Sequence, residues 1–158
     1  MQKKHMLQCP KGFSITELLI VCGIIAVLTL ITVPAFLRYA ANTNLKSAVR
    51  EITSDILGQK ERAISRNLQQ RIVFNTGNES YTLQEESGGV WTTIQTKLLS
   101  SFGSNIDITG TTFGSNAITC QTRGTASMGT LTMTNNRGST ATITTNITGR
   151  TNVTYNMQ

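Results

Sequence analysis

One continuous apolar run dominates the hydrophobic pattern of this 158-residue chain. Between residues 18 and 37 the only polar side chains are those of Thr29 and Thr32, whose hydroxyls can donate to helix carbonyls. A helix of this length, at about 1.5 Å per residue, measures roughly 30 Å, which is the thickness of a bilayer's hydrocarbon core. The run therefore predicts a membrane-spanning helix, in which Pro34 near the far end favours a kink.

Beyond the run, the apolar positions recur at steps of three and four residues, which predicts that the helix continues to about Gln69 as an amphipathic one. The positions of this stripe are Leu45, Ala48, Val49, Ile52, Ile56, Ile64 and Leu68. Residues 42–44, Asn-Thr-Asn, either loosen the helix or mark the point where it leaves the membrane. An amphipathic helix needs a cover for its apolar stripe, and we expect that cover to be a β-sheet.

The second half of the chain alternates apolar and polar residues in short segments separated by Gly and Asn, a pattern that predicts strands. These segments are 71–74, 81–83, 90–94, 106–108, 117–120, 129–133 and 141–144. Residues 75–78 predict a hairpin between the first two, and Trp91 is expected to pack on the sheet. The fold class is therefore α+β: a long N-terminal helix, its first half membrane-spanning, packed on a C-terminal antiparallel β-sheet domain.

A single carboxylate, that of Glu17, immediately precedes the apolar run. An ionised side chain costs about 2.5–3.5 kcal/mol at the centre of a span and less near the interface. No basic residue lies within the run, so an ionic partner for Glu17 would have to come from another chain. The alternative is that Glu17 lies at headgroup level and is only solvated.

The junction GFSITELLIV at residues 12–21 resembles the class III leader junction of type IV prepilins and type II secretion pseudopilins. The resemblance implies that a prepilin peptidase cuts between Gly12 and Phe13 and methylates the new amine of Phe13. It further implies that Glu17 pairs with the N-terminal amine of the neighbouring subunit in the filament. Ser14 and Thr16 differ from the family's commonest residues.

The proposed cut precedes the apolar run, whereas a secretory signal peptide is cut after its apolar core. The two alternatives are an ordinary signal anchor and conventional cleavage between residues 35 and 41, which would release a soluble protein. Basic residues flank the apolar run on both sides, so the positive-inside rule does not determine the orientation of the helix in the membrane. The predicted orientation depends mainly on the resemblance of residues 12–21 to a leader junction. The flanking basic residues are Lys3, Lys4, Lys11, Arg38, Lys46 and Arg50.

The C-terminal half, with Arg123-Gly124, then GTLT at residues 129–132, Gly138 and TGR at residues 148–150, is similar to the GspH/FimT group of minor pilins and pseudopilins. The resemblance implies a leader peptide at 1–12, a membrane and filament-core helix at 13–37, an amphipathic continuation at 38–70 and a β-rich pilin domain at 71–158.

As a minor pilin or pseudopilin, the chain would join or prime a type IV pilus or a type II secretion pseudopilus. Its implied partners are other pilin or pseudopilin subunits, the prepilin peptidase and the inner-membrane assembly platform. Before assembly it would be anchored in a bacterial inner membrane with the globular domain in the periplasm. The sequence does not determine whether the filament is a type IV pilus or a type II secretion pseudopilus. It also does not determine whether the subunit lies at the tip or in the shaft.

DNA binding is the alternative function, since FimT-like members that bind DNA use a GRxR-type tail. Gly149-Arg150-Thr151-Asn152 supplies the first arginine of that tail and lacks the second. Arg123, Arg137 and Arg150 are the candidate contacts to phosphate. Scattered cations of this kind also serve simply as solvated surface.

Catalysis, metals and cofactors are not expected. The only histidine, His5, lies in the leader, and no metal-ligand spacing occurs. The three cysteines make no disulfide framework, because Cys9 lies in the leader, Cys22 in the apolar run and Cys120 alone in the second half. We expect Cys120 to be a buried small apolar residue.

Overall fold

The structure is a computed structural model that describes residues 12–103 and 105–158. The chain divides into two compact units, one ending at Leu37 and the other comprising Arg38–Gln158, and each is described by itself. The predicted leader, apart from Gly12, lies outside the described residues, and so do His5 and Cys9.

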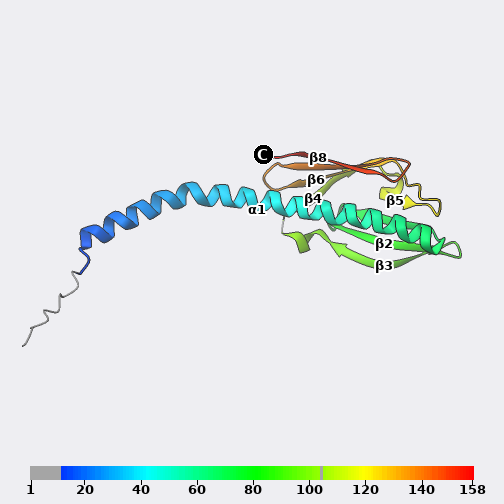
Figure 1. The fold of residues 1–158 in the computed structure, drawn as a ribbon, viewed down its shortest axis with the longest axis horizontal. Coiled ribbons are helices and arrows are strands. Elements are labelled where there is room, and N and C mark those ends of the chain that lie inside the picture. Colours follow the sequence, from blue (N-terminus) through cyan, green and yellow to red (C-terminus); the bar gives the residue numbers. More distant parts are fainter. Residues whose placement is uncertain (1–11, 104) are drawn as a thin grey trace, which may run out of the picture. The chain divides into compact units, whose positions relative to one another are not determined.

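One helix, α1 (Ile15–Arg66), 52 residues long, is the first element of the described chain (Figure 1). It runs unbroken through residues 42–44, so the first of the two alternatives, that these residues loosen the helix, is wrong. Thr43 there donates its hydroxyl to the carbonyl of Tyr39 at 2.8 Å, which satisfies the side chain without opening the backbone ladder.

Eight strands follow the helix, and all of their pairings within the sheets are antiparallel. Their bounds are β1 (Gln70–Asn75), β2 (Ser80–Ser87), β3 (Val90–Leu98), β4 (Ile106–Thr111), β5 (Ala117–Cys120), β6 (Gly129–Asn135), β7 (Thr140–Thr145) and β8 (Thr151–Asn156). The short 3-10 helices η1 (Leu99–Phe102) and η2 (Gly114–Asn116) lie between β3 and β4 and before β5. The α+β expectation is confirmed, including the hairpin of β1 and β2.

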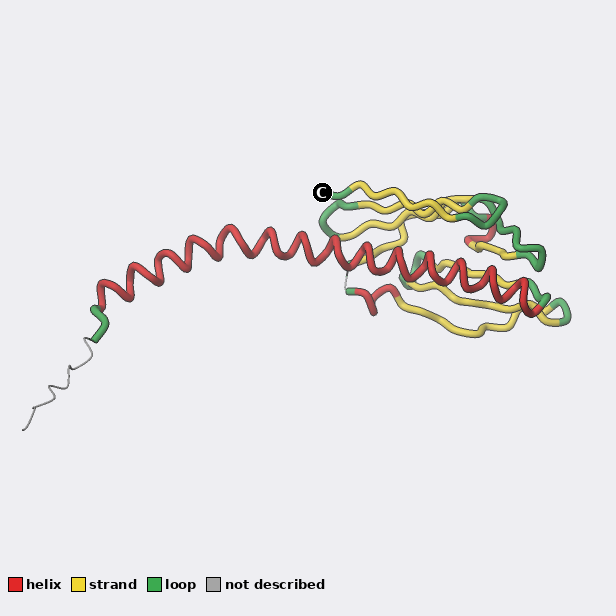
Figure 2. The backbone as a smooth tube through the Cα atoms, viewed as in Figure 1, coloured by secondary structure: helices red, strands yellow, loops and turns green. Residues whose placement is uncertain are grey.

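The strands form two four-stranded sheets rather than one. The first sheet has the order β3-β2-β1-β5 and the second β4-β6-β7-β8, and both accompany the helix segment of the second unit (Figure 2). Alternation along a strand shows which side chains are buried but not which strands pair, so the sequence did not separate the two sheets. β8 was not predicted, because its only apolar side chains are Val153 and Tyr155.

The buried stripe of α1 fills the core between these sheets. Leu45, Ile52 and Ile56 are fully buried, as the three- and four-residue spacing predicted. The stripe then continues through Gln59 and Ala63, whereas Ile64 is 52% exposed. The expectation that Ile64 belongs to the stripe is therefore wrong, because a glutamine occupies the core position one turn after Ile56. The helix also ends at Arg66 rather than near Gln69, so Leu68 lies beyond it.

A half-buried charge cluster joins the first sheet to the helix. The amine of Lys97 on β3 lies 2.6 Å from a carboxylate oxygen of Glu51 and 2.8 Å from one of Asp55. The hydroxyl of Tyr81 donates to the same Asp55 carboxylate at 2.7 Å. Burial and this hydrogen bond to a carboxylate raise the pKa of Tyr81. Burial lowers the pKa of Lys97, but its hydrogen bonds to the two carboxylates outweigh burial and raise that pKa overall.

A polar network joins the second sheet to the helix at the other end of the domain. The side-chain oxygen of Asn42 accepts from the amide of Asn135 at 2.9 Å and from the hydroxyl of Ser139 at 2.7 Å. Its amide donates to the carbonyl of Gln158 at 3.3 Å. Asn42 is thus the residue through which the helix holds both the β6–β7 turn and the C-terminal residue.

Two sequence expectations about single residues are settled by their surroundings. Cys120 is fully buried, as expected, and burial raises the pKa of its thiol to about 11. Trp91 lies on the first sheet, half-buried, with the guanidinium carbon of Arg71 4.1 Å from its ring centroid. A cation over the indole face adds to its packing role.

Candidate subunit-docking site

The helix segment of the first unit presents an exposed apolar surface. Every described residue from 12 to 37 is exposed, and large side chains such as Leu30 and Ile31 are more than 70% exposed. This is the one helix among the described residues that is long and apolar enough to cross a membrane. Contiguous apolar surface of this extent marks contact with lipid or with other protein chains.

The few polar groups within this apolar surface are satisfied locally. Thr29 donates its hydroxyl to the carbonyls of Ile25 and Ala26 at 2.9 and 2.8 Å, and Thr32 donates to Leu28 at 2.8 Å. Both threonines therefore behave as the sequence predicted. This surface can therefore be buried in lipid or protein without leaving either threonine hydroxyl unsatisfied.

Glu17 lies in the first turn of α1, just after the Gly12–Phe13 junction. Ser14 precedes the helix, and its carbonyl accepts the amide of Leu18 at 3.1 Å. Its hydroxyl pairs with that of Thr16 at 2.7 Å. A carboxylate here is stabilised by the positive end of the helix dipole.

No hydrogen bond or ion pair joins the Glu17 carboxylate to any other described residue. Ser14 and Glu17 also have the S-x-x-E spacing of a capping box, a signal that our sequence reasoning missed. In this structure the serine hydroxyl is directed to Thr16 instead. The exposed carboxylate is thus available to a cation on another molecule.

A shallow apolar hollow of about 490 Å³ lies on the same helix segment. It is lined by Ile20, Gly23, Ile24, Val27 and Leu28. Gly23 has no side chain to fill the surface, and a Cβ built there would meet no atom within 4 Å. Small residues on a membrane helix let another helix approach closely, so this hollow suits a packed neighbour.

The candidate basic residues fall at two different places in the second unit. Arg150 lies in the β7–β8 turn and Arg123 in the β5–β6 connection, and the amide of Ala126 donates to the carbonyl of Ile147 at 3.1 Å, which joins these two segments. Arg137 lies in the β6–β7 turn, at the other end of the second sheet. The structure therefore brings Arg123 and Arg150 to the same end and leaves Arg137 apart.

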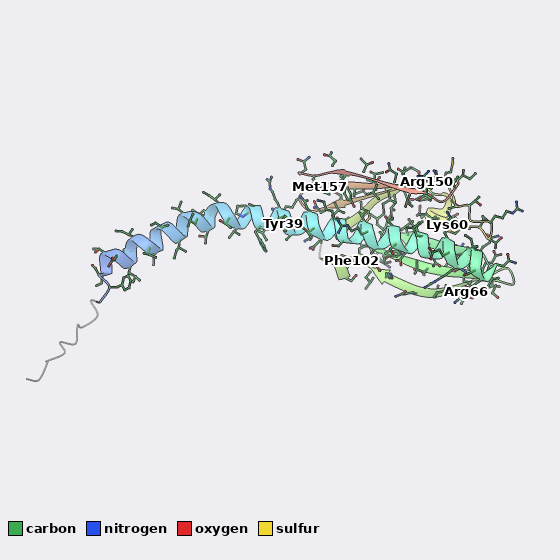
Figure 3. All side chains as sticks on the ribbon, viewed as in Figure 1. Tyr39, Lys60, Arg66, Phe102, Arg150 and Met157 are labelled. Atoms are coloured by element: carbon green, nitrogen blue, oxygen red, sulfur yellow. The ribbon has the colours of Figure 1, made fainter. Side chains whose placement is uncertain are left out.

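Lys60 of α1 adds a third cation to the end that holds Arg123 and Arg150, and sequence reasoning missed it. Its amine donates to the carbonyl of Thr148 at 2.9 Å. Lys60 and Arg150 are labelled in Figure 3. Gly149 has φ of 69° and passes so close that a Cβ there would lie 2.9 Å from the Lys60 side chain. The left-handed backbone of the β7–β8 turn at Gly149 favours glycine, whereas the flexible Lys60 side chain could move away from a Cβ.

No group of three or more His, Cys, Asp or Glu side chains that could hold a metal ion occurs within residues 12–103 and 105–158. The hollows near Arg150 and Arg123 measure about 340 and 440 Å³. Both are lined by polar and basic side chains, with threonines, asparagines and glutamines around the arginines.

No family description matches the sequence, and no curated protein matches it significantly. Solved structures do match the fold. A structure of the minor pseudopilin EpsH from the type 2 secretion system of Vibrio cholerae has a TM-score of 0.60 and 13% identity, covering 70% of this chain and 96% of that one. A second EpsH structure has a TM-score of 0.59 and 12% identity, covering 72% and 94%.

The type IV minor pilin FimU of Pseudomonas aeruginosa has a TM-score of 0.55 and 14% identity, covering 73% of this chain and 92% of that one. At these identities the likeness concerns the fold. The long N-terminal helix packed on antiparallel sheets is shared with proteins of both filament classes. This chain therefore has the pilin fold of minor pseudopilins and type IV minor pilins.

Proposed function

We propose that this protein is a minor pilin or pseudopilin, a structural subunit that joins or primes a type IV pilus or a type II secretion pseudopilus. The observation that carries the proposal is the exposed apolar part of α1, residues 15–37. Its first turn holds Glu17, whose carboxylate has no partner among the described residues. The pilin fold of the chain supports it.

The helix would serve two environments in turn. Before assembly its apolar surface would be covered by lipid in a bacterial inner membrane, with the domain beyond residue 37 in the periplasm. In a filament the same surface would be covered by the helices of other subunits. Both environments satisfy the apolar side chains, and the transfer does not expose them to water.

Processing by a prepilin peptidase between Gly12 and Phe13 would create a cation for Glu17, which has no ionic partner among the described residues. An amine at Phe13 would lie at the positive end of α1, where the helix dipole disfavours a cation unless a carboxylate is near. The carboxylate of a neighbouring subunit would supply that charge. A buried amine and a buried carboxylate are each costly alone and tolerable together, so the pair would set the axial register of the subunits.

The division of the chain follows from this proposal: residues 1–12 as leader, 13–37 as anchor and filament core, 38–70 as the amphipathic part, in which the helix ends at Arg66, and 71–158 as the β-rich domain. The chain would act as the substrate of the peptidase and as cargo of the assembly platform, with no catalytic role of its own.

Deletion of the gene, with complementation by the wild-type chain, tests the proposal. Surface pili and secreted protein are both measured in the same strains. A loss of surface pili or of secreted protein that the wild-type chain restores would support the proposal. Which of the two is lost would show to which filament the subunit belongs. Normal levels of both in the deletion strain would contradict it.

Nucleic-acid binding is the second candidate, and the observation that favours it is the convergence of Lys60, Arg123 and Arg150 at one end of the domain. Gel shift of the full chain in detergent, at low and raised salt, tests it. The double variant Arg123→Ala, Arg150→Ala should lose retardation, whereas Arg137→Ala at the opposite end should keep it. Absence of retardation of the wild type even at low salt would remove this candidate.

A further inference from the structure

Two four-stranded sheets have four edge strands, and the edges differ in how they are protected against pairing with another chain. Natural edges are protected by bulges, inward-pointing charges, short length or a covering segment. β3 has a bulge at Ile94 and an inward-pointing charge at Lys97. β4 has a bulge at Thr109.

The β5 edge is protected in another way, because the strand is only four residues long. The segment that follows it also folds back against it. Cys120 bridges to Ala126, and the amide of Ser127 donates to the carbonyl of Thr119 at 3.0 Å. Three of the four edges therefore carry a device that hinders strand addition.

β8 carries none of these devices. Its sequence, TNVTYN, contains no charged residue, proline or glycine. It pairs with β7 over six consecutive residues without a register shift, from Thr145↔Thr151 to Thr140↔Asn156. An edge of this kind presents a regular row of backbone donors and acceptors, which is a template for another strand.

An apolar groove of about 290 Å³ lies beside β8, between this strand and α1. Val153 and Tyr155 face inward from β8, opposite the buried Ile143 and Ala141 of β7, yet Tyr155 remains 37% exposed. Leu57 of the helix lines the groove and is 45% exposed. The core is thus incompletely covered on the side where a further strand would be added.

The charge on the groove indicates what would cover it. Arg50 is the only charged residue of the lining; it is exposed and forms no ion pair with any described residue. A strand laid over the groove would remove water from the guanidinium, so the incoming strand needs a carboxylate opposite Arg50. A second copy would offer an uncharged β8 and another Arg50, so like charges would face each other.

We infer that β8 and the α1 groove beside it are a docking site for a β-strand of a different filament subunit. The incoming strand pairs with β8, places apolar side chains over Leu57, Val153 and Tyr155, and carries an acidic residue against Arg50. This inference depends on the proposed function only for the identity of the partner, which is a sister pilin-like subunit of the same organism.

The test uses the full-length chain in detergent, mixed with each purified sister subunit in turn, and measures hydrogen exchange and affinity. Binding by one sister should slow exchange of the β8 amides, residues 151–156, by roughly tenfold or more. Arg50→Glu should weaken binding roughly tenfold, and Arg137→Glu, an exposed arginine outside the groove, by less than about twofold. Unchanged exchange of the buried β6 amides in both variants would show that they are folded.

A charge exchange sharpens the test further. Mutation of the matching acid of the sister strand to lysine should restore affinity for the Arg50→Glu chain. Four results would overturn the inference: no sister binds, binding protects other segments and not β8, β8 is protected by raising the concentration of this chain alone, or Arg50→Glu acts no more strongly than Arg137→Glu. None of these four results would change the phenotype of the deletion strain, which tests the proposed function separately.

Discussion

Isoleucine has opposite environments in the two units of this chain. Ile52 in the second unit is fully buried, whereas Ile24 in the first is 55% exposed. Both belong to the same helix, so the difference comes from what surrounds each residue and not from secondary structure. The second unit buries Ile52 in its own core, whereas the first leaves its apolar surface for lipid or other chains.

The carboxylates show the same contrast. In the second unit Asp55 accepts from Lys97 and Tyr81, and Glu79 accepts the amide of Ile108 at 2.7 Å, which joins the first sheet to the second. Glu17 in the first unit has no such partner among the described residues. The second unit therefore depends on its own contacts for stability, and the first depends on other molecules.

The largest effect is expected from Glu17→Val. Loss of the docking charge should reduce entry into filaments about tenfold or more, because a neighbour's buried amine would lack its partner. Membrane insertion and cleavage should persist, since the apolar run and the Gly12–Phe13 junction are intact. The measurement is an immunoblot of sheared filament and membrane fractions, with mass analysis of the membrane form.

Glu61→Val is the matched control for Glu17→Val, because Glu61 is exposed on the second unit and forms no ion pair with a described residue. It should assemble as the wild type does. If Glu17→Val entered filaments as well as the wild type does, Glu17 would not be the charge through which the first unit docks on other subunits.

Three isoleucine variants separate core from docking surface. Ile52→Ala should lower the free energy of unfolding of the second unit by about 2–5 kcal/mol, as removal of buried methyl groups does in packed cores. Ile64→Ala, at a half-exposed position, should lower it by about 1 kcal/mol or less. Ile24→Ala should leave it unchanged.

Urea unfolding of the full chain in detergent, followed by Trp91 fluorescence, measures all three isoleucine variants. If Ile24→Ala lowered the free energy of unfolding of the second unit as much as Ile52→Ala does, the stabilities of the two units would not be independent.

The charge cluster of the second unit supports a smaller prediction. Lys97→Met should cost about 2 kcal/mol of unfolding free energy, because Asp55 and Glu51 would lose their cation. Arg137→Met, on an exposed turn, should change stability by less than about 0.5 kcal/mol. Because the folded pKa of Lys97 is raised, its contribution is fully present below the unfolded pKa and is lost as pH rises through the folded value.

Urea midpoints at pH 7 and at strongly alkaline pH measure the Lys97 effect. The difference between wild type and Lys97→Met should shrink at the higher pH. A constant difference would argue against the ion pair as its cause.

The smallest effect concerns Cys120. Burial raises its folded pKa to about 11, above the value of about 8.5 for a free thiol. Between these values the unfolded chain loses the proton first, so wild-type stability should fall as pH rises through this window. Cys120→Ala should have a flatter profile over the same range, measured as urea midpoints from pH 8 to 10. Parallel profiles would contradict this origin of the pH dependence.

The sequence predicted the parts of the molecule that a local period determines. The apolar run, the buried stripe up to Ile56 and seven of the eight strands follow directly from spacing and alternation. It failed where a polar residue stands in the core, as Gln59 does, and where a strand has few apolar side chains, as β8 does.

The candidate sites divide in the same way. Glu17 could be singled out because a carboxylate beside an apolar run is rare. The convergence of Arg123, Arg150 and Lys60 could not be predicted, since it depends on turns separated by many residues in sequence. The β8 groove needed the order of the strands, which alternation does not provide.

The most direct test of the central claim, that the apolar first unit is retained and docks through Glu17, is the N-terminal residue of the mature protein. Mass analysis of protein purified from membranes and from filaments should find a chain that begins at Phe13 with a methylated amine. A chain that begins at Met1 would lack the amine placed beside Glu17, and one that begins after residue 37 would lack the helix. Either result would contradict the account.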